Sequence, residues 1–180
     1  MTIGTGIGVG IVVDGQLYKT RLAGAGEFGH MVISEDGEQC TCGRKGCLET
    51  WVSATALIRQ GKKAMAENKD SKLWDICTEE TVSPEHIFEA ARSGDETAAG
   101  IVKQYKEKLS VGIINIANAM RPELILIGGG VAAQGDSLLE GVRENLQKYC
   151  FGSRKAQVPE LAIAQLGNKA GMVGAASLVK

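Results

Sequence analysis

Four potential metal ligands lie within residues 30–47 and restrict how the chain can fold around them: His30, Cys40, Cys42 and Cys47. One imidazole and three thiols make a complete set of four nitrogen and sulfur ligands, the number that a structural zinc ion takes in a tetrahedral site. Glycines at positions 43 and 46 let the chain fold back between the ligands. The alternative is a loop with three reduced cysteines and an ordinary histidine, but this spacing favours a closed, structural zinc site.

Two carboxylates, Glu27 and Glu49, lie close to these ligands in the sequence. Carboxylates accept hydrogen bonds from sugar hydroxyls, and a metal that fixes the loop would also fix the carboxylates. His30 has two distinct ring nitrogens, so one can bind zinc while the other contacts a ligand. The alternative for each glutamate is a solvated surface charge.

Composition narrows the class of protein. Five cysteines, an odd number with three of them clustered, argue against a disulfide framework and favour a reducing cytoplasm. The net charge of −1 gives no electrostatic reason to expect a nucleic acid or an anionic membrane as partner. No apolar run approaches the ~20 residues that a membrane-spanning helix needs. Cys77, Cys150 and His86 have no partner pattern and are expected to be structural or surface residues.

The N-terminal part predicts short strands. Residues 2–13 alternate between β-branched or apolar residues and glycines, a period of two that indicates a strand or hairpin. A face made of glycine indicates close approach of another group to the backbone. Asp14-Gly15 predicts a hairpin turn, 16–22 the returning strand, and 31–33 a short third strand.

Within this stretch, Gly4-Thr5-Gly6-Ile7-Gly8 offers backbone N–H groups and a hydroxyl, which suit a phosphate. It is not a P-loop, since no Gly-Lys-Ser/Thr follows, and it does not match Gly-x-Gly-x-x-Gly. Taken alone, the stretch fits a tightly packed hairpin equally well.

After the cysteine loop the apolar period becomes helical. A first helix is predicted over about 50–67. A second begins with Ser83 as its N-cap and Pro84 at its first position, and Gly94 ends it. A third covers 96–120, with Asp95 as its N-cap. Beyond Pro122, the continuous apolar run 124–127 predicts a strand buried on both faces. A capping box at 137–140 predicts a helix to about Tyr149, followed by a strand at 161–164 and a helix at 171–179.

The glycines 128–130 follow the apolar run 124–127 directly, so they fall at the carboxyl end of a strand, where α/β folds bind ligands. A flexible strand–helix turn is the alternative. Strands first, then helices, then alternating strands and helices give a mixed α/β layer fold.

Together these motifs resemble the ROK family of bacterial sugar kinases and repressors, and within it the glucokinases most. The resemblance covers essentially the whole chain. It rests on Gly4-Thr5-Gly6-Ile7-Gly8, on Ala25 to His30, and on Cys40-Thr41-Cys42-Gly43 with Gly46-Cys47-Leu48-Glu49. Weaker support comes from Leu126 to Val131 and Leu166 to Gly171.

The resemblance implies an actin-like, hexokinase-type (ribonuclease H-like) fold, a mixed sheet with flanking helices and a zinc loop, here at 26–49. It implies zinc on His30, Cys40, Cys42 and Cys47, and sugar contacts from Glu27, His30 and Glu49. It further implies that Gly4, Thr5 and Gly6 face ATP phosphates and that Gly128, Gly129 and Gly130 face the nucleoside. The expected ligands are glucose or a similar hexose and ATP with Mg, and the expected assembly is a homodimer.

Two family features have no counterpart in these 180 residues: an Asp-x-Gly-Gly-Thr phosphate loop and an Asn-Asp-type segment with the catalytic Asp. We therefore expect residues 1–180 to be the C-terminal lobe of an ATP-dependent glucokinase that phosphorylates the 6-hydroxyl of glucose. The lobe alone should be inactive and has no catalytic base of its own. The alternatives are a sugar-sensing ROK repressor, which would bind nucleic acid, and a kinase for N-acetylmannosamine or fructose.

Overall fold

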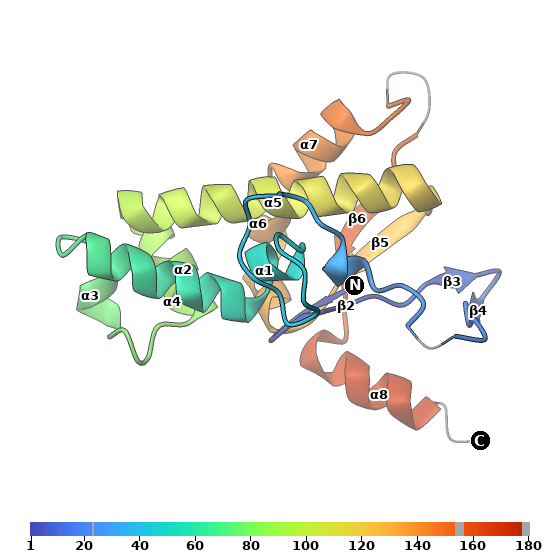
Figure 1. The fold of residues 1–180 in the computed structure, drawn as a ribbon, viewed down its shortest axis with the longest axis horizontal. Coiled ribbons are helices and arrows are strands. Elements are labelled where there is room, and N and C mark those ends of the chain that lie inside the picture. Colours follow the sequence, from blue (N-terminus) through green and yellow to red (C-terminus); the bar gives the residue numbers. More distant parts are fainter. Residues whose placement is uncertain (23, 154–156, 178–180) are drawn as a thin grey trace.

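The computed structural model describes residues 1–22, 24–153 and 157–177. Its N-terminal half holds short strands and helices: β1 (Thr2–Ile3), β2 (Ile7–Gly8), β3 (Val12–Val13), β4 (Gln16–Leu17), η1 (Phe28–His30), α1 (Glu49–Val52), α2 (Ala54–Glu67), α3 (Leu73–Ile76) and α4 (Pro84–Arg92). The second half holds α5 (Glu96–Met120), β5 (Leu124–Ile127), η2 (Gly130–Gln134), α6 (Asp136–Leu139), α7 (Val142–Tyr149), β6 (Glu160–Ile163), η3 (Gly167–Lys169) and α8 (Ala170–Ser177). The fold is mixed α/β, as predicted (Figure 1).

Two two-stranded sheets lie edge to edge. β1 pairs antiparallel with β2, and β5 pairs parallel with β6. A parallel bridge between Thr2 and Gly128 joins the two pairs, and the Ile3 N–H donates to the Gly128 carbonyl at 2.8 Å. This bridge places β1, and with it the N-terminal glycine turn, next to the turn that follows β5.

A second hairpin, β3–β4, extends away from these sheets (Figure 1). Asp14 and Gly15 form its turn with φ of 51° and 74°, the positive values that a two-residue hairpin turn requires. The turn prediction is therefore confirmed. The returning strand is shorter than predicted, because only Gln16–Leu17 pair.

The long helix α5 is the centre of the hydrophobic core and packs against α1, α2, α4 and α7 (Figure 1). It begins after the predicted Asp95 cap and ends at Met120, where the C-cap Arg121 is in the left-handed region with φ of 47°. A Cβ at Gly112, in the middle of α5, would overlap the Leu48 side chain. Leu48 follows Cys47 directly, so this contact anchors the cysteine loop to the core.

Several predicted elements differ in detail. Residues 31–33 form no strand, only an isolated bridge from Val32 to Cys47. The helix predicted over 50–67 is two helices, because Ser53 is extended and caps α2 by accepting from the Ala56 N–H at 3.1 Å. The short α3 carries no strong periodic signal and was not predicted.

The prediction that β5 is buried on both faces was wrong. Its residues alternate between exposed and buried, with Leu124 and Leu126 each 45% exposed. Ile125 and Ile127 alone join the core cluster, which also contains residues of α5. A run of four aliphatic residues does not reveal how many layers cover a strand, so the sequence overestimated its burial.

The prediction of a capping box at 137–140 was also wrong. The Ser137 hydroxyl donates back to the Gln134 carbonyl at 2.7 Å and caps no N–H. Gly141, with φ of 72°, interrupts the predicted helix, so α6 ends at Leu139 and α7 begins at Val142.

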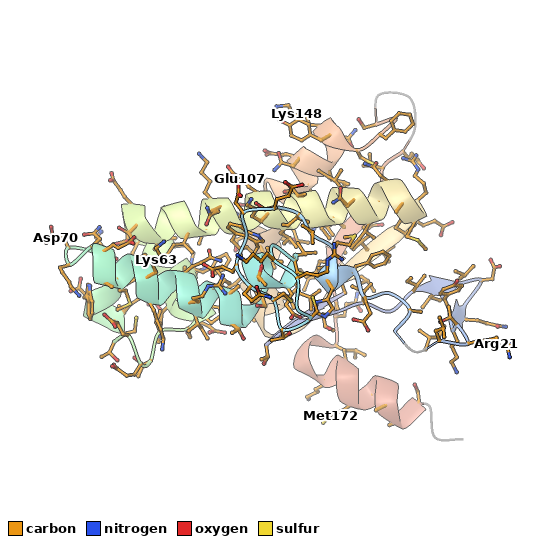
Figure 2. All side chains as sticks on the ribbon, viewed as in Figure 1. Arg21, Lys63, Asp70, Glu107, Lys148 and Met172 are labelled. Carbon is orange, nitrogen blue, oxygen red and sulfur yellow. The ribbon has the colours of Figure 1, made fainter. Side chains whose placement is uncertain are left out.

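The C-terminal helix α8 lies apart from the core, as the labelled Met172 shows in Figure 2. The predicted helix agrees with α8 up to Ser177, and residues 178 and 179 lie outside the described residues. Among the described residues, no helix combines the length and apolarity that crossing a membrane requires.

Asp95 gives a first prediction, for stability against pH. Its carboxylate is buried and accepts from the N–H groups of Ala98 and Lys72, both at 2.6 Å. Burial alone would raise the pKa of Asp95, but these hydrogen bonds outweigh it and leave the pKa lowered.

Because the folded-state pKa is depressed, the stabilisation by Asp95 is present above the pKa of an unfolded aspartate and is lost as pH falls through the folded value. Asp95→Ala should lower the free energy of unfolding by about 1–2 kcal/mol at neutral pH, as for other lost helix caps. Urea titrations of both proteins from pH 7 to pH 3 should show this difference shrinking. A constant difference across that range would contradict the assignment.

Candidate functional site

The predicted zinc ligands come together. One ligand atom from each of His30, Cys40, Cys42 and Cys47 lies within 4.8 Å of the others. His30 Nδ1 is 3.5 Å from Cys40 Sγ, and Cys42 Sγ is 3.6 Å from Cys47 Sγ. A disulfide would require about 2 Å between sulfurs, whereas two sulfurs held ~2.3 Å from one tetrahedral zinc lie roughly 3.8 Å apart. The donor set and the spacing therefore both fit a single zinc ion.

Backbone hydrogen bonds close the loop around this cluster. The Ile33 N–H donates to the Gly46 carbonyl at 2.9 Å, and the Leu48 N–H donates to the Met31 carbonyl at 2.8 Å. Nearer the tip, the Cys40 N–H donates to the Arg44 carbonyl at 2.7 Å. Gly46 has φ of 70°, and a Cβ there would overlap the Ser34 carbonyl oxygen. Glycine at this position allows the two sides of the loop to meet.

The thiols differ in their electrostatic environment. Burial, together with the neighbouring thiols of Cys42 and Cys40, raises the pKa of Cys47 to about 12. A hydrogen bond from the Arg44 backbone N–H lowers the pKa of the exposed Cys42. Zinc binds thiolates, so its binding here would release protons. His30 directs Nδ1 toward Cys40, which leaves Nε2 as the nitrogen for a second contact.

Glu49 lies at the start of α1 and reaches the N-terminal hairpin. Its Oε2 accepts from the Ile7 N–H at 2.7 Å, and the residue is half-buried. A Cβ at Gly6 would overlap this carboxylate, so the glycine at position 6 makes room for it. Oε1 of Glu49 has no hydrogen-bond partner within the described part of the chain and can accept from a ligand hydroxyl.

The other two predicted sugar contacts, Glu27 and His30, lie at the two ends of η1. His30 belongs to η1, which packs against β2, and the exposed Glu27 precedes η1 at its N-cap position. A Cβ at Gly29 would lie 2.8 Å from the Ile7 carbonyl oxygen, so only glycine permits this contact. Ile7 is therefore the point where η1 and the Glu49 carboxylate meet.

The two glycine turns also lie side by side. Gly4, Thr5 and Gly6 form the turn between β1 and β2, where the Gly4 N–H donates to the Gly6 carbonyl at 3.0 Å. The predicted nucleoside turn 128–130 follows β5, the strand next to β1, and Gly129 packs its backbone against that of Ile3. The Thr5 side chain is exposed.

Sequence reasoning did not find a cavity of about 500 Å³ between α4, α5 and residues 137–145. Its lining contains the basic residues Arg92, Lys103 and Lys106, the acidic residues Glu107, Glu140 and Glu144, and several apolar side chains. None of the predicted site residues borders it. These charged residues come from α4, α5 and residues 140–144, so they give no local pattern in the sequence.

Comparison with known proteins identifies the family of this chain. The family model described as the ROK family matches residues 1–180. The chain belongs to the ROK family. It is 41% identical to a glucokinase of Halalkalibacterium halodurans over 182 aligned residues, which cover 100% of this chain and 55% of that protein. This ROK chain thus spans about half the length of the curated relatives it matches.

Solved ROK structures share its fold. A ROK family glucokinase from Streptomyces griseus, in complex with glucose and AMPPNP, superposes with a TM-score of 0.89 at 33% identity, over 98% of this chain and 58% of that one. A ROK family transcriptional regulator, a homologue of the E. coli MLC protein, gives a TM-score of 0.81 at 32% identity, over 97% and 43%. The family thus includes both kinases and regulators with this fold.

Proposed function

We propose that residues 1–180 are the C-terminal lobe of an ATP-dependent glucokinase that phosphorylates the 6-hydroxyl of glucose. The observation that supports it most is the set of three groups that contact the β1–β2 hairpin, whose own turn is Gly4-Thr5-Gly6. They are the glycine turn after β5, the Glu49 carboxylate, and η1 with His30. The glucokinase relative at 41% identity, and the fold shared with a glucokinase that binds glucose and AMPPNP, support the same assignment.

In this proposal, each part of the site has a separate task. The Glu27 and Glu49 carboxylates accept hydrogen bonds from sugar hydroxyls, and the free ring nitrogen of His30 forms a hydrogen bond with a sugar hydroxyl. Gly4, Thr5 and Gly6 face the ATP phosphates, and Thr5 and Gly6 present their backbone N–H groups to them, since the Gly4 N–H is bound within the turn. The Mg²⁺ is bound with the nucleotide, and residues 128–130 face the nucleoside. Zinc on His30, Cys40, Cys42 and Cys47 holds the loop rigid without taking part in the reaction.

Phosphoryl transfer also needs a base that takes the proton of the attacking hydroxyl. We assign that base to a second lobe, so residues 1–180 alone should bind ligands weakly and transfer no phosphate. A homodimer in the cytoplasm is part of the same proposal.

A coupled assay on the full-length protein tests the proposal. With ATP and Mg²⁺, glucose should be phosphorylated with a kcat/KM at least about 10-fold above that for fructose or N-acetylmannosamine, since one or two hydroxyl contacts change it by this order. The 180-residue chain assayed alone should show no turnover. Turnover by the 180-residue chain, or none by the full-length protein with any hexose, would contradict it.

The regulator among the structural relatives supports a second candidate, a sugar-sensing repressor. A repressor binds operator DNA and releases it when sugar binds, and it has no need of ATP. Titrating the full-length protein with a fluorescent ATP analogue separates the two, because a kinase should bind it and a repressor should not. Retention of both glycine turns favours the kinase.

A further inference from the structure

The turn between β1 and β2 is held from one side by a single short segment, residues 49–55. Glu49 Oε2 accepts from the Ile7 N–H at 2.7 Å. The Ala54 N–H donates to the Gly4 carbonyl at 2.8 Å. The Thr55 hydroxyl donates to the Thr5 carbonyl at 2.9 Å. Three bonds from one segment thus fix three of the four residues 4–7.

The turn has little else to fix its shape. Its own hydrogen bond joins Gly4 to Gly6 at 3.0 Å, and the strands on either side are two residues each. Two glycines in a three-residue turn leave the backbone free to adopt many conformations. Fixing the orientation of its N–H groups therefore depends on bonds from outside the turn.

We propose that residues 49–55 form a positioning element for this turn and that Thr55 is the positioning residue acting on Thr5. The proposal rests on the proposed function, in which the turn faces the phosphates of ATP. Thr55 would touch neither substrate; it would hold the Thr5 carbonyl so that the neighbouring N–H groups point toward the phosphates. The reaction then gains from preorganised donors, which lose no energy in reorienting.

The position of Thr55 supports this task. It lies in the first turn of α2, two residues after the Ser53 cap, and is itself exposed. An exposed threonine hydroxyl in a helix usually bonds to water or to its own helix, but this one bonds across to Thr5. The segment 49–55 also begins just after the zinc ligand Cys47 and contains Glu49, the proposed sugar contact. The zinc loop, the Glu49 carboxylate and the turn are therefore linked through one short, continuous segment.

Thr55→Val removes the hydroxyl at nearly constant shape, and Thr55→Ser keeps it. In the full-length protein, Thr55→Val should raise the KM for ATP about 3- to 10-fold, as expected for one lost hydrogen bond. The KM for the sugar, the zinc content and the melting temperature should stay near wild type. Thr55→Ser should behave like wild type.

Hydrogen–deuterium exchange of the peptide covering residues 2–8 gives a readout that does not need activity. Exchange there should be faster in Thr55→Val than in Thr55→Ser, and unchanged in the zinc loop. Wild-type KM for ATP and wild-type exchange in Thr55→Val would overturn the proposal, as would an equal rise of both KM values with a lower melting temperature. If the full-length protein binds no nucleotide, the proposed function fails, while the exchange comparison still decides whether Thr55 positions the turn.

Discussion

Replacing Cys47 with serine is expected to remove zinc from the protein and to disorder the loop between residues 31 and 48. Cys47 is fully buried, its thiol lies 3.6 Å from that of Cys42, and its neighbour Leu48 packs on α5. A serine hydroxyl is a poor zinc ligand, and three remaining ligands leave the site open. Since binding of structural zinc contributes directly to folding, its loss should cost several kcal/mol of stability.

Metal analysis and urea unfolding check this prediction on protein purified without added zinc. Wild type should carry about one zinc per chain, and Cys47→Ser should carry far less. Glu49 lies two residues from Cys47, so the loss of zinc in Cys47→Ser should also lower the glucose affinity of the full-length protein.

A second cysteine separates loss of metal from loss of packing. Cys42 is exposed, so Cys42→Ser removes a ligand without leaving a gap in the core. It should still lose zinc and much of the same stability. Cys77→Ser, outside the cluster, should keep its zinc. A wild type without zinc, or a Cys42→Ser variant that keeps both zinc and stability, would contradict the assignment.

The four zinc ligands could be found from sequence because the site is local. All four lie between residues 30 and 47, and a zinc ligand set depends on residue type and spacing, both of which the sequence states. The cap at Asp95 and the turn at Asp14-Gly15 could be predicted for the same reason. Each is decided by the chemistry of one or two neighbouring residues.

The contacts that join distant segments were not predictable in this way. Glu49 was identified as a carboxylate near zinc, but its bond to the Ile7 N–H joins residues 42 positions apart and depends on how β2 meets α1. The Thr55 contact with Thr5 spans 50 positions. An exposed threonine in a helix carries no sequence signal for such a bond, so only the folded chain reveals it.

The wrong predictions for the burial of β5 and for the helix after residue 137 have a related cause. The pattern of β5 predicts a strand, but whether both faces are buried depends on what packs on it, and Leu124 and Leu126 remain exposed. Gly141 was overlooked as a helix break, although its positive φ separates α6 from α7. Local propensity decides that an element exists, and packing decides its extent and its burial.

Gly129→Ala should be among the most destabilising substitutions outside the zinc loop. Gly129 has φ of 90° and ψ of 179°, a region that only glycine adopts readily. A Cβ there would overlap the carbonyl oxygen of Ile3, in the strand that pairs beside β5. Backbone strain of about 1–3 kcal/mol adds to an overpacking cost of about 1–3 kcal/mol. The sum is a large part of the roughly 5–15 kcal/mol that stabilises a typical domain.

The next residue provides the control. A Cβ at Gly130 would meet no atom within 4 Å, and its φ is not positive, so Gly130→Ala should change the free energy of unfolding by less than about 1 kcal/mol. Urea unfolding of both variants measures the difference. Since Gly129 packs on Ile3, its replacement should also increase hydrogen exchange in β1, whereas Gly130→Ala should not. Equal stabilities for the two variants would show that the close contact between Gly129 and Ile3 does not hold the two glycine turns together.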